Sequence, residues 1–369
     1  MSFGTVQADV IQSSVANTSL GAGNSSIMKN RLINSGMVID QRYSGGAISA
    51  STLGAGAYTI DRWVYGASQS NNFSAQQNQG SVTTPAGFVN YLGLTVASSY
   101  SIGSSDYFNI AQRIEGFNVA DLGWGTSNAK TVTLSFWVYS SLTGTFGGAL
   151  RNSAHNRSYP FTYSIPVANT WTQISITIAG DTSGTWLTTN GVGIELDFGL
   201  GVGSTYSGTA GSWAGSNYLS ATGAVSVVGT SGATFYLTGV QLEVGSSATG
   251  FEYRQYGQEL ALCQRYFYAT NALLNNNSPF FYGEFYSSSL ALGTLRMPVT
   301  MRAVPSATTL GTFSIAQGSS AVTTSSVSIN QASQDAIIFQ CTVSGAPTGV
   351  CRWGSNSSNS TGFLISAEL

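Results

Sequence analysis

The amino-acid sequence predicts a mainly β protein: an extended N-terminal arm, a jelly-roll β-sandwich, a short connecting helix and a smaller C-terminal β-sandwich. Many short segments alternate apolar and polar residues, as half-buried strands do. The 369 residues include 44 glycines and 7 prolines, which suits numerous tight turns. Only 8% of the residues are charged, against about 25% in a typical domain, so Ser, Thr, Asn, Gln and Gly must cover the surface.

Residues 1–27 are polar, with one short apolar run in "TVQADVIQSS". Such a segment cannot bury a core alone, so it is predicted to be an attachment or oligomerisation arm. The first residues, "MSFGTVQADV", lack the basic region and the apolar run of a secretory signal. We therefore expect synthesis and folding in the cytoplasm.

Residues 28–250 are predicted to form the jelly-roll sandwich. Its first strands are expected in "RLINSGMVIDQR" and "AYTIDRWVYGAS". The clearest strand is "KTVTLSFWVYSS", and "TWTQISITIAG", "GVGIELDFG" and "TFYLTGVQLEVGS" repeat its alternation. The side chains expected to face the core are Val132, Leu134, Phe136, Val138, Ile174, Ile176, Ile178, Val192, Ile194, Leu196, Phe198, Val240, Leu242 and Val244.

The segment "FEYRQYGQELALCQRYFY", residues 251–268, differs from the rest because it carries several charges and a helical pattern. Leu260, Cys263 and Phe267 share one face of a helix expected at about 257–267. Gly257 would cap this helix, and Glu259 and Arg265 would have the signs that the helix dipole favours at its two ends. The helix is predicted to connect two β-domains, with its apolar face in the junction.

Residues 269–369 are predicted to form the smaller β-domain. Within it, a hairpin centred on Ala346 would set Cys341 opposite Cys351, so a cross-strand disulfide is sterically feasible. Two reduced core residues side by side are the favoured alternative, because free cysteines are often buried. Three cysteines in all also suit a reducing compartment better than a disulfide scaffold.

Catalytic chemistry has little support in the sequence. His155 is the only histidine, and it is expected in a solvated loop without an orienting partner, so triads and His-rich zinc sites are not indicated. No phosphate-binding or dinucleotide motif is found. Glu195 and Asp197 share a strand face and could span the distance of about 5 Å that some glycosidases need, but no third feature supports hydrolysis. The chain is therefore expected not to be an enzyme.

A binding face is the stronger hypothesis, because aromatic side chains stand on the non-core faces of predicted strands. Rings stack on the apolar faces of sugars, while carboxylates and amides hydrogen-bond to hydroxyls. The predicted saccharide platform comprises Trp137, Tyr139, Gln173, Glu195 and Asp197. A second set of aromatic residues lies in expected loops: Trp124, Trp186, Tyr206, Trp213 and Tyr218. The alternatives are that a loop or another subunit covers the platform, and that the loop aromatics pin their loops.

No cofactor is assigned. Calcium held by Asp, Asn and backbone carbonyls would be compatible with such a fold, but no EF-hand spacing appears. The net charge of −2 provides no electrostatic footprint for nucleic acid or an anionic membrane. No run approaches the roughly 18 apolar residues of a membrane span, so no membrane insertion is expected.

Several long motifs, in order, resemble phage tail-fibre and related virion proteins that carry a carbohydrate-binding-module-like jelly roll. They are "KNRLINSGMVIDQR", "YTIDRW", "RIEGFNVADLGWGTSNAKTVTLSFWVYSSLTGTFGGALRN", "SYPFTYSI", "TWTQISITIAGDTSGTW" and "FYLTGVQLEVGSSATGFEYRQYGQELALCQRYF". The resemblance covers most of residues 28–268. The segment before it is similar to the leader of this module, and the C-terminal region matches more loosely.

This resemblance implies a non-enzymatic virion component, exposed on the phage tail or particle surface and assembled in the host cytoplasm. It implies a homotrimeric fibre, attached to other virion proteins through residues 1–27, whose outer modules recognise host surface saccharides. A purely structural role, as a capsid decoration, head fibre or tail adaptor, is the alternative, and a glycan-degrading tailspike is a third. The resemblance does not identify ligand-binding residues.

Overall fold

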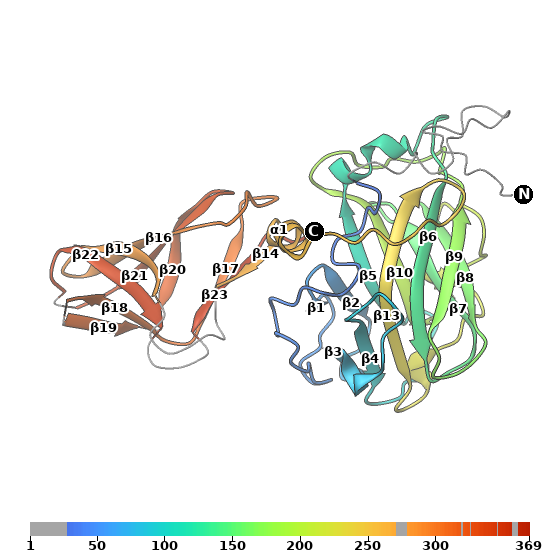
Figure 1. Cartoon of the computed structure of the whole chain (residues 1–369), viewed down its shortest axis with the longest axis horizontal. Coiled ribbons are helices and arrows are strands. Elements are labelled where there is room, and N and C mark those ends of the chain that lie inside the picture. Colours follow the sequence, from blue (N-terminus) through green and yellow to red (C-terminus); the bar gives the residue numbers. More distant parts are fainter. Residues whose placement is uncertain (1–27, 271–278, 319, 325, 345, 356–360) are drawn as a thin grey trace, which may run out of the picture.

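The computed structural model describes residues 28–270, 279–318, 320–324, 326–344, 346–355 and 361–369. It is mainly β, with a larger module, a smaller module and one α-helix between them (Figure 1). The predicted fold class is confirmed for the described part of the chain. The predicted arm, residues 1–27, lies outside the described residues.

The larger module is a sandwich of two antiparallel sheets. The first sheet has six strands, in the spatial order β1 (Tyr58–Ile60), β2 (Trp63–Ala67), β5 (Tyr107–Glu115), β10 (Val192–Val202), β7 (Gly144–Arg151) and β8 (Ser158–Ile165). The second has five, in the order β3 (Phe73–Gln77), β4 (Leu92–Val96), β13 (Thr234–Val244), β6 (Val132–Ser140) and β9 (Thr172–Ile178). A short parallel pair, β11 (Ser207–Gly208) and β12 (Ser220–Ala221), and four 3₁₀ turns complete it: η2 (Gln79–Ser81), η3 (Gly116–Asn118), η4 (Ala120–Leu122) and η5 (Val227–Gly229).

The inner faces of the two sheets share one apolar core, to which β6, β10 and β13 contribute alternate residues. Of the fourteen predicted inward side chains, ten are buried in this core: Val132, Leu134, Phe136, Val138, Ile178, Ile194, Leu196, Phe198, Val240 and Leu242. Ile174, Ile176 and Val244 are partly buried and pack against it. The alternation thus identified the inner faces of these strands correctly.

The prediction of a strand at "RLINSGMVIDQR" is wrong. Residues 31–42 form turns, and both Asn34 and Met37 have left-handed backbone conformations, with φ of 54° and 58°. The side chain of Asn34 satisfies backbone groups that a neighbouring strand would otherwise bind. Its amide donates to the carbonyls of Ile39 and Asp61, and its oxygen accepts from Ile39 N. This local hydrogen bonding competes with a ladder.

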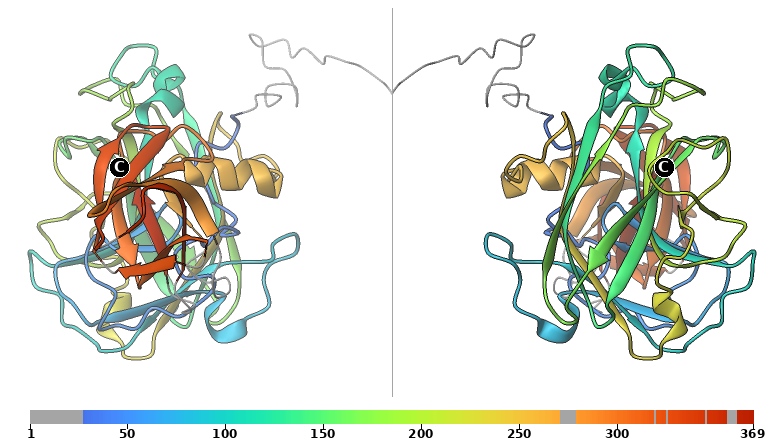
Figure 2. Two further views of the ribbon diagram at one scale, coloured as in Figure 1. Left: turned by 90° about the vertical axis from the view of Figure 1, so that its left-hand side faces the viewer. Right: turned by 90° about the vertical axis from the view of Figure 1, so that its right-hand side faces the viewer.

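The helix α1 (Tyr256–Gln264) ends earlier than the predicted 257–267. Gln255, not Gly257, is its N-cap, and Gly257 lies inside the helix. Phe267 opens strand β14 (Phe267–Ala269), so it does not share the helical face with Leu260 and Cys263 as predicted. Figure 2 shows α1 standing out to one side of the molecule.

A small apolar cluster joins α1 to both modules. Cys263 and Tyr266 are buried against Ile33 and Ile39 of the larger module, with Leu260, Leu262 and Leu369 packed around them. Three ion pairs, made by two carboxylates, reinforce this junction. Glu115 of β5 pairs with Arg265 and accepts from Tyr266 Oη at 2.6 Å, and Glu368 pairs with Arg62 and with Arg42. The prediction that the helix fills a junction is confirmed for Leu260 and Cys263.

The smaller module consists of a seven-stranded and a three-stranded sheet. The first has the order β19 (Ser320–Thr324), β18 (Phe313–Gln317), β22 (Gly349–Ser355), β15 (Pro279–Ser287), β16 (Leu290–Arg296), β21 (Ala336–Thr342) and β20 (Val327–Ala332). The second has the order β14, β23 (Gly362–Ser366) and β17 (Ser306–Leu310). Phe363 of β23 stacks on Phe339 of β21 with ring centroids 4.2 Å apart, so both sheets contribute to one core.

The hairpin predicted to place Cys341 opposite Cys351 is wrong. Strands β15 and β16 lie between β21 and β22, so Cys341 pairs with Ala291 and Cys351 pairs with Gly283. Both cysteines are buried and free, in agreement with the favoured prediction of reduced core residues. Burial raises the pKa of both thiols, that of Cys341 to about 12.

Candidate functional site

The five residues of the predicted platform do not lie together. Trp137 and Tyr139 are on β6 and Gln173 is on β9, all on the outer face of the five-stranded sheet. Glu195 and Asp197 are on β10, in the six-stranded sheet across the core. Alternation separates core-facing from outward-facing residues, but the outward faces of two stacked sheets point in opposite directions. The platform was therefore predicted as one surface where the molecule has two.

On the five-stranded sheet, the aromatic side chains cover one another. Tyr139 stacks on Tyr236 with ring centroids 5.2 Å apart and planes within 6°, and Trp171 lies 5.5 Å away. Tyr91 and Tyr236 are buried, and Trp171 Nε1 donates to the carbonyl of Thr83 at 2.8 Å. For Tyr139 the structure thus favours the alternative of cover by a loop, while Trp137 is half-buried and Gln173 is exposed beside it.

On the six-stranded sheet, the register brings charged residues together across three neighbouring strands. Glu195 of β10 lies opposite Arg113 of β5 and Arg151 of β7. Asp197, two residues further, lies opposite Ala111 and an alanine of β7. Because Ile194, Leu196 and Phe198 fill the core, these polar side chains stand on the outer face of the sheet.

Arg151 is the centre of the resulting ionic network. Its Nε donates to Asp197 Oδ2 at 2.9 Å, and its second terminal nitrogen, Nη2, donates to Glu195 Oε1 at 2.9 Å. Its first, Nη1, donates to Asn217 Oδ1 at 2.5 Å. Both carboxylates are buried, and Asp197 is 0% exposed. Arginine suits this position because its planar fork binds several acceptors in fixed directions.

Two further side chains, those of His155 and Arg113, approach Glu195 from the solvent side. His155 Nε2 lies 3.3 Å from Glu195 Oε2, and Arg113 Nε lies 3.5 Å from the same oxygen. The side chains of His155 and Arg113 are 39% and 34% exposed. Burial opposes the ionisation of Glu195, but these neighbours and Arg151 outweigh it and lower the pKa of Glu195 to about 2. Burial raises the pKa of Asp197, whose charge depends on Arg151.

His155 does not stand free in a solvated loop as expected. A turn held by Asn152 positions it: Asn152 Oδ1 accepts from the backbone N–H groups of Asn156 and Arg157, both at 3.1 Å. Asn152 Nδ2 fixes this loop to Thr185 O at 3.0 Å. His155 itself takes a left-handed conformation, with φ of 53°, which turns its ring over Glu195.

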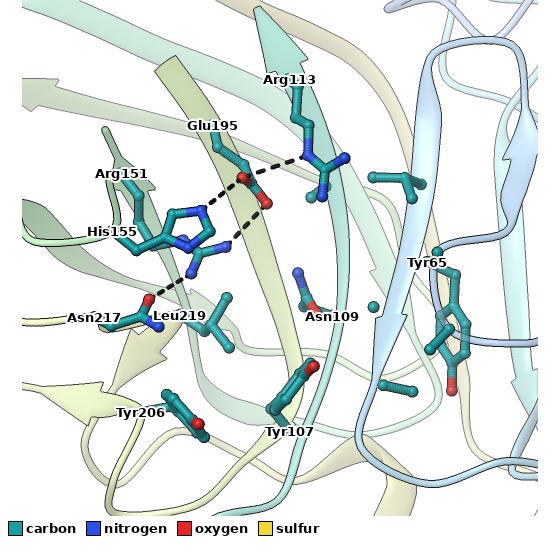
Figure 3. A pocket seen from close by; sticks show the side chains of 16 residues that line it. Tyr65, Tyr107, Asn109, Arg113, Arg151, His155, Glu195, Tyr206, Asn217 and Leu219 are labelled. Atoms are coloured by element: carbon teal, nitrogen blue, oxygen red, sulfur yellow. Dashed lines mark hydrogen bonds and ion pairs between the residues drawn. The ribbon is translucent and has the colours of Figure 1, made fainter. Parts of the chain in front are cut away.

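A pocket of about 240 Å³ lies on this face, bounded by the ionic network (Figure 3). Its lining residues are Ala55, Gly56, Val64, Tyr65, Gly66, Ala67, Tyr107, Asn109, Ala111, Arg113, Arg151, His155, Glu195, Tyr206, Asn217 and Leu219. Small side chains on adjacent strands leave the hollow. Gly66 lies opposite Asn109, and Ala111 lies opposite Val64. Gly66 leaves room for the Asn109 side chain, because a Cβ at Gly66 would lie 2.2 Å from Asn109 Oδ1.

Two tyrosines form the other end of the pocket. Tyr107 and Tyr206 make an edge-to-face pair with centroids 5.4 Å apart, opposite the charged end in Figure 3. No hydrogen bond of either hydroxyl is found among the described residues. The pocket thus combines aromatic faces, hydroxyls, amides and fixed charges, which are the groups that hydrogen-bond to and stack on polyhydroxylated ligands.

Of the predicted loop aromatics, Tyr206 reaches the pocket and the three tryptophans do not. Trp124, Trp186 and Trp213 pack edge to face on one another at 4.8–5.4 Å. Their indole N–H groups donate to the backbone oxygens of Lys130, Ser183 and Ala179. These tryptophans therefore pin loops, as the alternative held. Tyr218 packs against Gly208, beside the loop that carries Asn217.

The sequence pattern did not point to Arg151, Arg113, Tyr107 and Asn109 as pocket residues. In "YFNIAQRIE" the residues at 107, 109, 111 and 113 alternate with Phe108 and Ile110, so the outward face was readable. What the pattern could not supply was the strand order that sets this face beside Glu195. No group of three or more His, Cys, Asp or Glu side chains that could hold a metal ion is found in the described part of the chain.

No helix among the described residues is long and apolar enough to span a membrane. No protein-family model matches the chain, and no curated protein matches it in sequence. Among solved structures, the enzymatically active domain of tailspike protein 4 from bacteriophage CBA120 is similar over 56% of this chain, at 12% identity and a TM-score of 0.29. The chain spans 21% of that tailspike chain.

Two further solved structures are matched over nearly their whole length. The carbohydrate-binding module TmCBM61, in complex with β-1,4-galactotriose, is similar over 59% of this chain and 99% of its own, at 11% identity and a TM-score of 0.29. A putative sugar-binding protein from Bacteroides thetaiotaomicron is similar over 59% and 100%, at 10% identity and a TM-score of 0.30.

Proposed function

We propose that this chain is a non-enzymatic saccharide-binding protein and that the pocket on the six-stranded sheet is its binding site. One observation carries the proposal: a preformed hollow has an aromatic pair at one end and a fixed, buried ionic network at the other. Stacking on Tyr107 and Tyr206 would hold the apolar face of a sugar. The amides and charged groups would hold its hydroxyls.

Binding rather than hydrolysis is favoured by the state of the two carboxylates. A glycosidase needs both carboxyl groups within reach of the scissile bond. Asp197 is 0% exposed and its oxygens are taken by Arg151 and Asn109. Incubation with host polysaccharide is expected to release no reducing ends. Release that is lost on Glu195→Gln would instead establish a glycan-degrading enzyme.

The resemblance of the sequence motifs to phage tail-fibre proteins supports a place on the virion surface, where this pocket would contact host glycans. In this proposal residues 1–27 attach the chain to other virion proteins, and three copies act together. Several weak sites on one particle raise the overall avidity by orders of magnitude without any new contact.

A purely structural virion role is the second candidate, and one observation favours it. On the outer face of β15, Tyr282 and Tyr286 are 70% and 65% exposed, and Val350 on the neighbouring β22 is 69% exposed. Such a face suits contact with another protein. Binding of the purified chain to a glycan array would separate the two functions. Saccharide binding that is lost on Tyr107→Ala with Tyr206→Ala supports the first, and an array without any bound glycan refutes it.

A further inference from the structure

The side chain of Asn109, on the floor of the pocket, has a hydrogen-bond acceptor without a donor. Its Nδ2 donates to Asp197 Oδ1 at 2.6 Å, while its Oδ1 is buried and finds no partner among the described residues. Asn109 is 4% exposed and lines the pocket. A buried acceptor without a donor is costly, so such groups are normally satisfied.

The orientation of this amide is fixed by its neighbours. Asp197 also accepts from Arg151 Nε at 2.9 Å, which holds the carboxylate in place. Because Arg151 donates to both oxygens of Asp197, it favours the ionised carboxylate, which only accepts hydrogen bonds. The NH₂ group of Asn109 therefore faces Asp197, and its oxygen faces away. The ionic network therefore leaves a buried carbonyl oxygen without a donor at the floor of the pocket.

The size of the pocket limits what can bring a donor to this oxygen. Its volume is about 240 Å³. Pockets that enclose larger ligands typically measure about 300–1,000 Å³. Ala55, Gly56, His155 and Leu219, which lie outside the strands of the sheet, also line the pocket. This space suits one sugar ring.

We infer that the pocket takes a single terminal sugar residue of a glycan, rather than an internal stretch of the chain, and that one hydroxyl of this residue donates to Asn109 Oδ1. The inference rests on the proposed function and makes it more specific. The sugar ring would lie between the tyrosine end and the charged end of the pocket, with its glycosidic bond toward solvent. The identity and configuration of that hydroxyl would then set specificity, because a site with an unpaired acceptor rejects a sugar that lacks the donor.

The test is calorimetric titration of the full chain with methyl glycosides of common hexoses and hexosamines, and with matching oligosaccharides of two to four residues. The terminal methyl glycoside is expected to retain the affinity of its oligosaccharides within about threefold. One monodeoxy analogue is expected to lose at least about tenfold, the cost of one unmade hydrogen bond. Affinity that rises about tenfold with each added residue would overturn the inference and leave saccharide binding intact. If no saccharide of any length binds, the proposed function is refuted as well.

Two variants connect the effect to Asn109. Asn109→Ala is expected to weaken binding at least about tenfold and to abolish discrimination against the deoxy analogue. Asn72→Ala is the matched control, since Asn72 is also buried with an unpartnered Oδ1, but it donates to Ser98 O away from the pocket. It is expected to bind as the wild type does. Unchanged binding by a folded Asn109→Ala would overturn the inference.

Gly66→Ala provides a second approach if Asn109→Ala does not fold. Gly66 does not require a left-handed conformation, so the backbone accepts alanine. The added methyl group would meet Asn109 Oδ1 at 2.2 Å and displace the amide. We expect a loss of at least about tenfold in affinity, the equivalent of one unmade hydrogen bond. If Gly66→Ala binds with the affinity of the wild type and keeps its preference for a sugar over the deoxy analogue, the role of Asn109 is contradicted.

Discussion

The outer faces of the two sheets of the larger module both carry aromatic side chains, yet they differ in what surrounds them. On the five-stranded sheet, Tyr139 stacks on Tyr236 and a loop held by Trp171 covers the cluster. On the six-stranded sheet, Tyr107 and Tyr206 border a hollow whose other end is charged. An aromatic residue on a polar strand face is therefore not sufficient for a site. The proposed site differs in having small residues that leave space and cross-strand charges at its other end.

The distribution of charge separates the two faces further. In a chain with only 8% charged residues, the outer face of the six-stranded sheet holds both the pocket network and one of the junction ion pairs. Arg113 lies between them: its Nε is 3.5 Å from Glu195 Oε2 and its Nη1 donates to Leu369 O at 2.5 Å. The face that carries the pocket is thus also the face on which the smaller module is held.

The largest effect that would test this contrast is expected from Arg151→Ala. It leaves Asp197 and Glu195 buried without their main cation, and breaking such a pair costs about 3–5 kcal/mol. Urea unfolding should show a lower midpoint at an unchanged m-value. Arg352→Ala, at an exposed arginine without an ion pair among the described residues, should change the free energy of unfolding by less than about 0.5 kcal/mol. A loss below about 1 kcal/mol for Arg151→Ala would mean that the network is not held as described.

An intermediate effect is expected from Glu115→Gln at the junction end of the same face. Glu115 accepts from Arg265 at 2.6 and 2.9 Å and from Tyr266, and the loss of such charged hydrogen bonds costs about 1.5–3 kcal/mol. Burial opposes the ionisation of Glu115, but these hydrogen bonds outweigh it and lower its pKa below the ordinary value of 4.5.

The lowered pKa of Glu115 gives the effect a defined pH dependence. A carboxyl whose pKa is lower in the folded state contributes stability above its unfolded pKa, and this stability is lost as the pH falls through the folded value. The difference in unfolding free energy between wild type and Glu115→Gln should therefore be full near neutral pH and should shrink below about pH 4.5. A difference that stays constant down to pH 2 would contradict the ionic contact.

The smallest effect is expected on the five-stranded face. Tyr139→Ala removes a stacked ring and should lower stability by about 0.5–1.5 kcal/mol beyond the area it buries. Combined with Trp137→Ala, it should leave saccharide binding unchanged, which thermal unfolding and a glycan array would show together. If the double variant folds stably but no longer binds saccharide, the binding site is instead the outer face that carries Trp137 and Tyr139.

The sequence predicted the parts of this molecule that depend on local pattern. The inner faces of β6, β10 and β13 follow from alternation, and α1 follows from a helical pattern. The last predicted turn of the helix does not form, because Phe267 pairs with β23 instead. The site depends instead on strand order. Glu195 was recognised, but its partners come from β5 and β7, which lie about 80 and 45 residues earlier in the chain. No periodicity encodes which distant strands become neighbours.

The turn at Asn34 and the position of His155 were missed for a different reason. In both places an asparagine side chain organises a left-handed turn through local hydrogen bonds to the backbone, and the alternation of apolar and polar residues does not reveal such bonds. The single histidine looked solvated because its carboxylate partner lies 40 residues away.

The proposed function depends most directly on which face of the larger module binds saccharide. The measurement that decides it is a comparison of wild type, Tyr206→Ala and Tyr139→Ala on one glycan array, with folding of each verified by its unfolding transition. Tyr206→Ala should lose at least about tenfold in affinity for the glycans that the wild type binds, as expected for the loss of a stacking ring in a pocket, and Tyr139→Ala should bind as the wild type does. Loss in Tyr139→Ala with full binding in Tyr206→Ala would contradict the account and move the site to the other sheet.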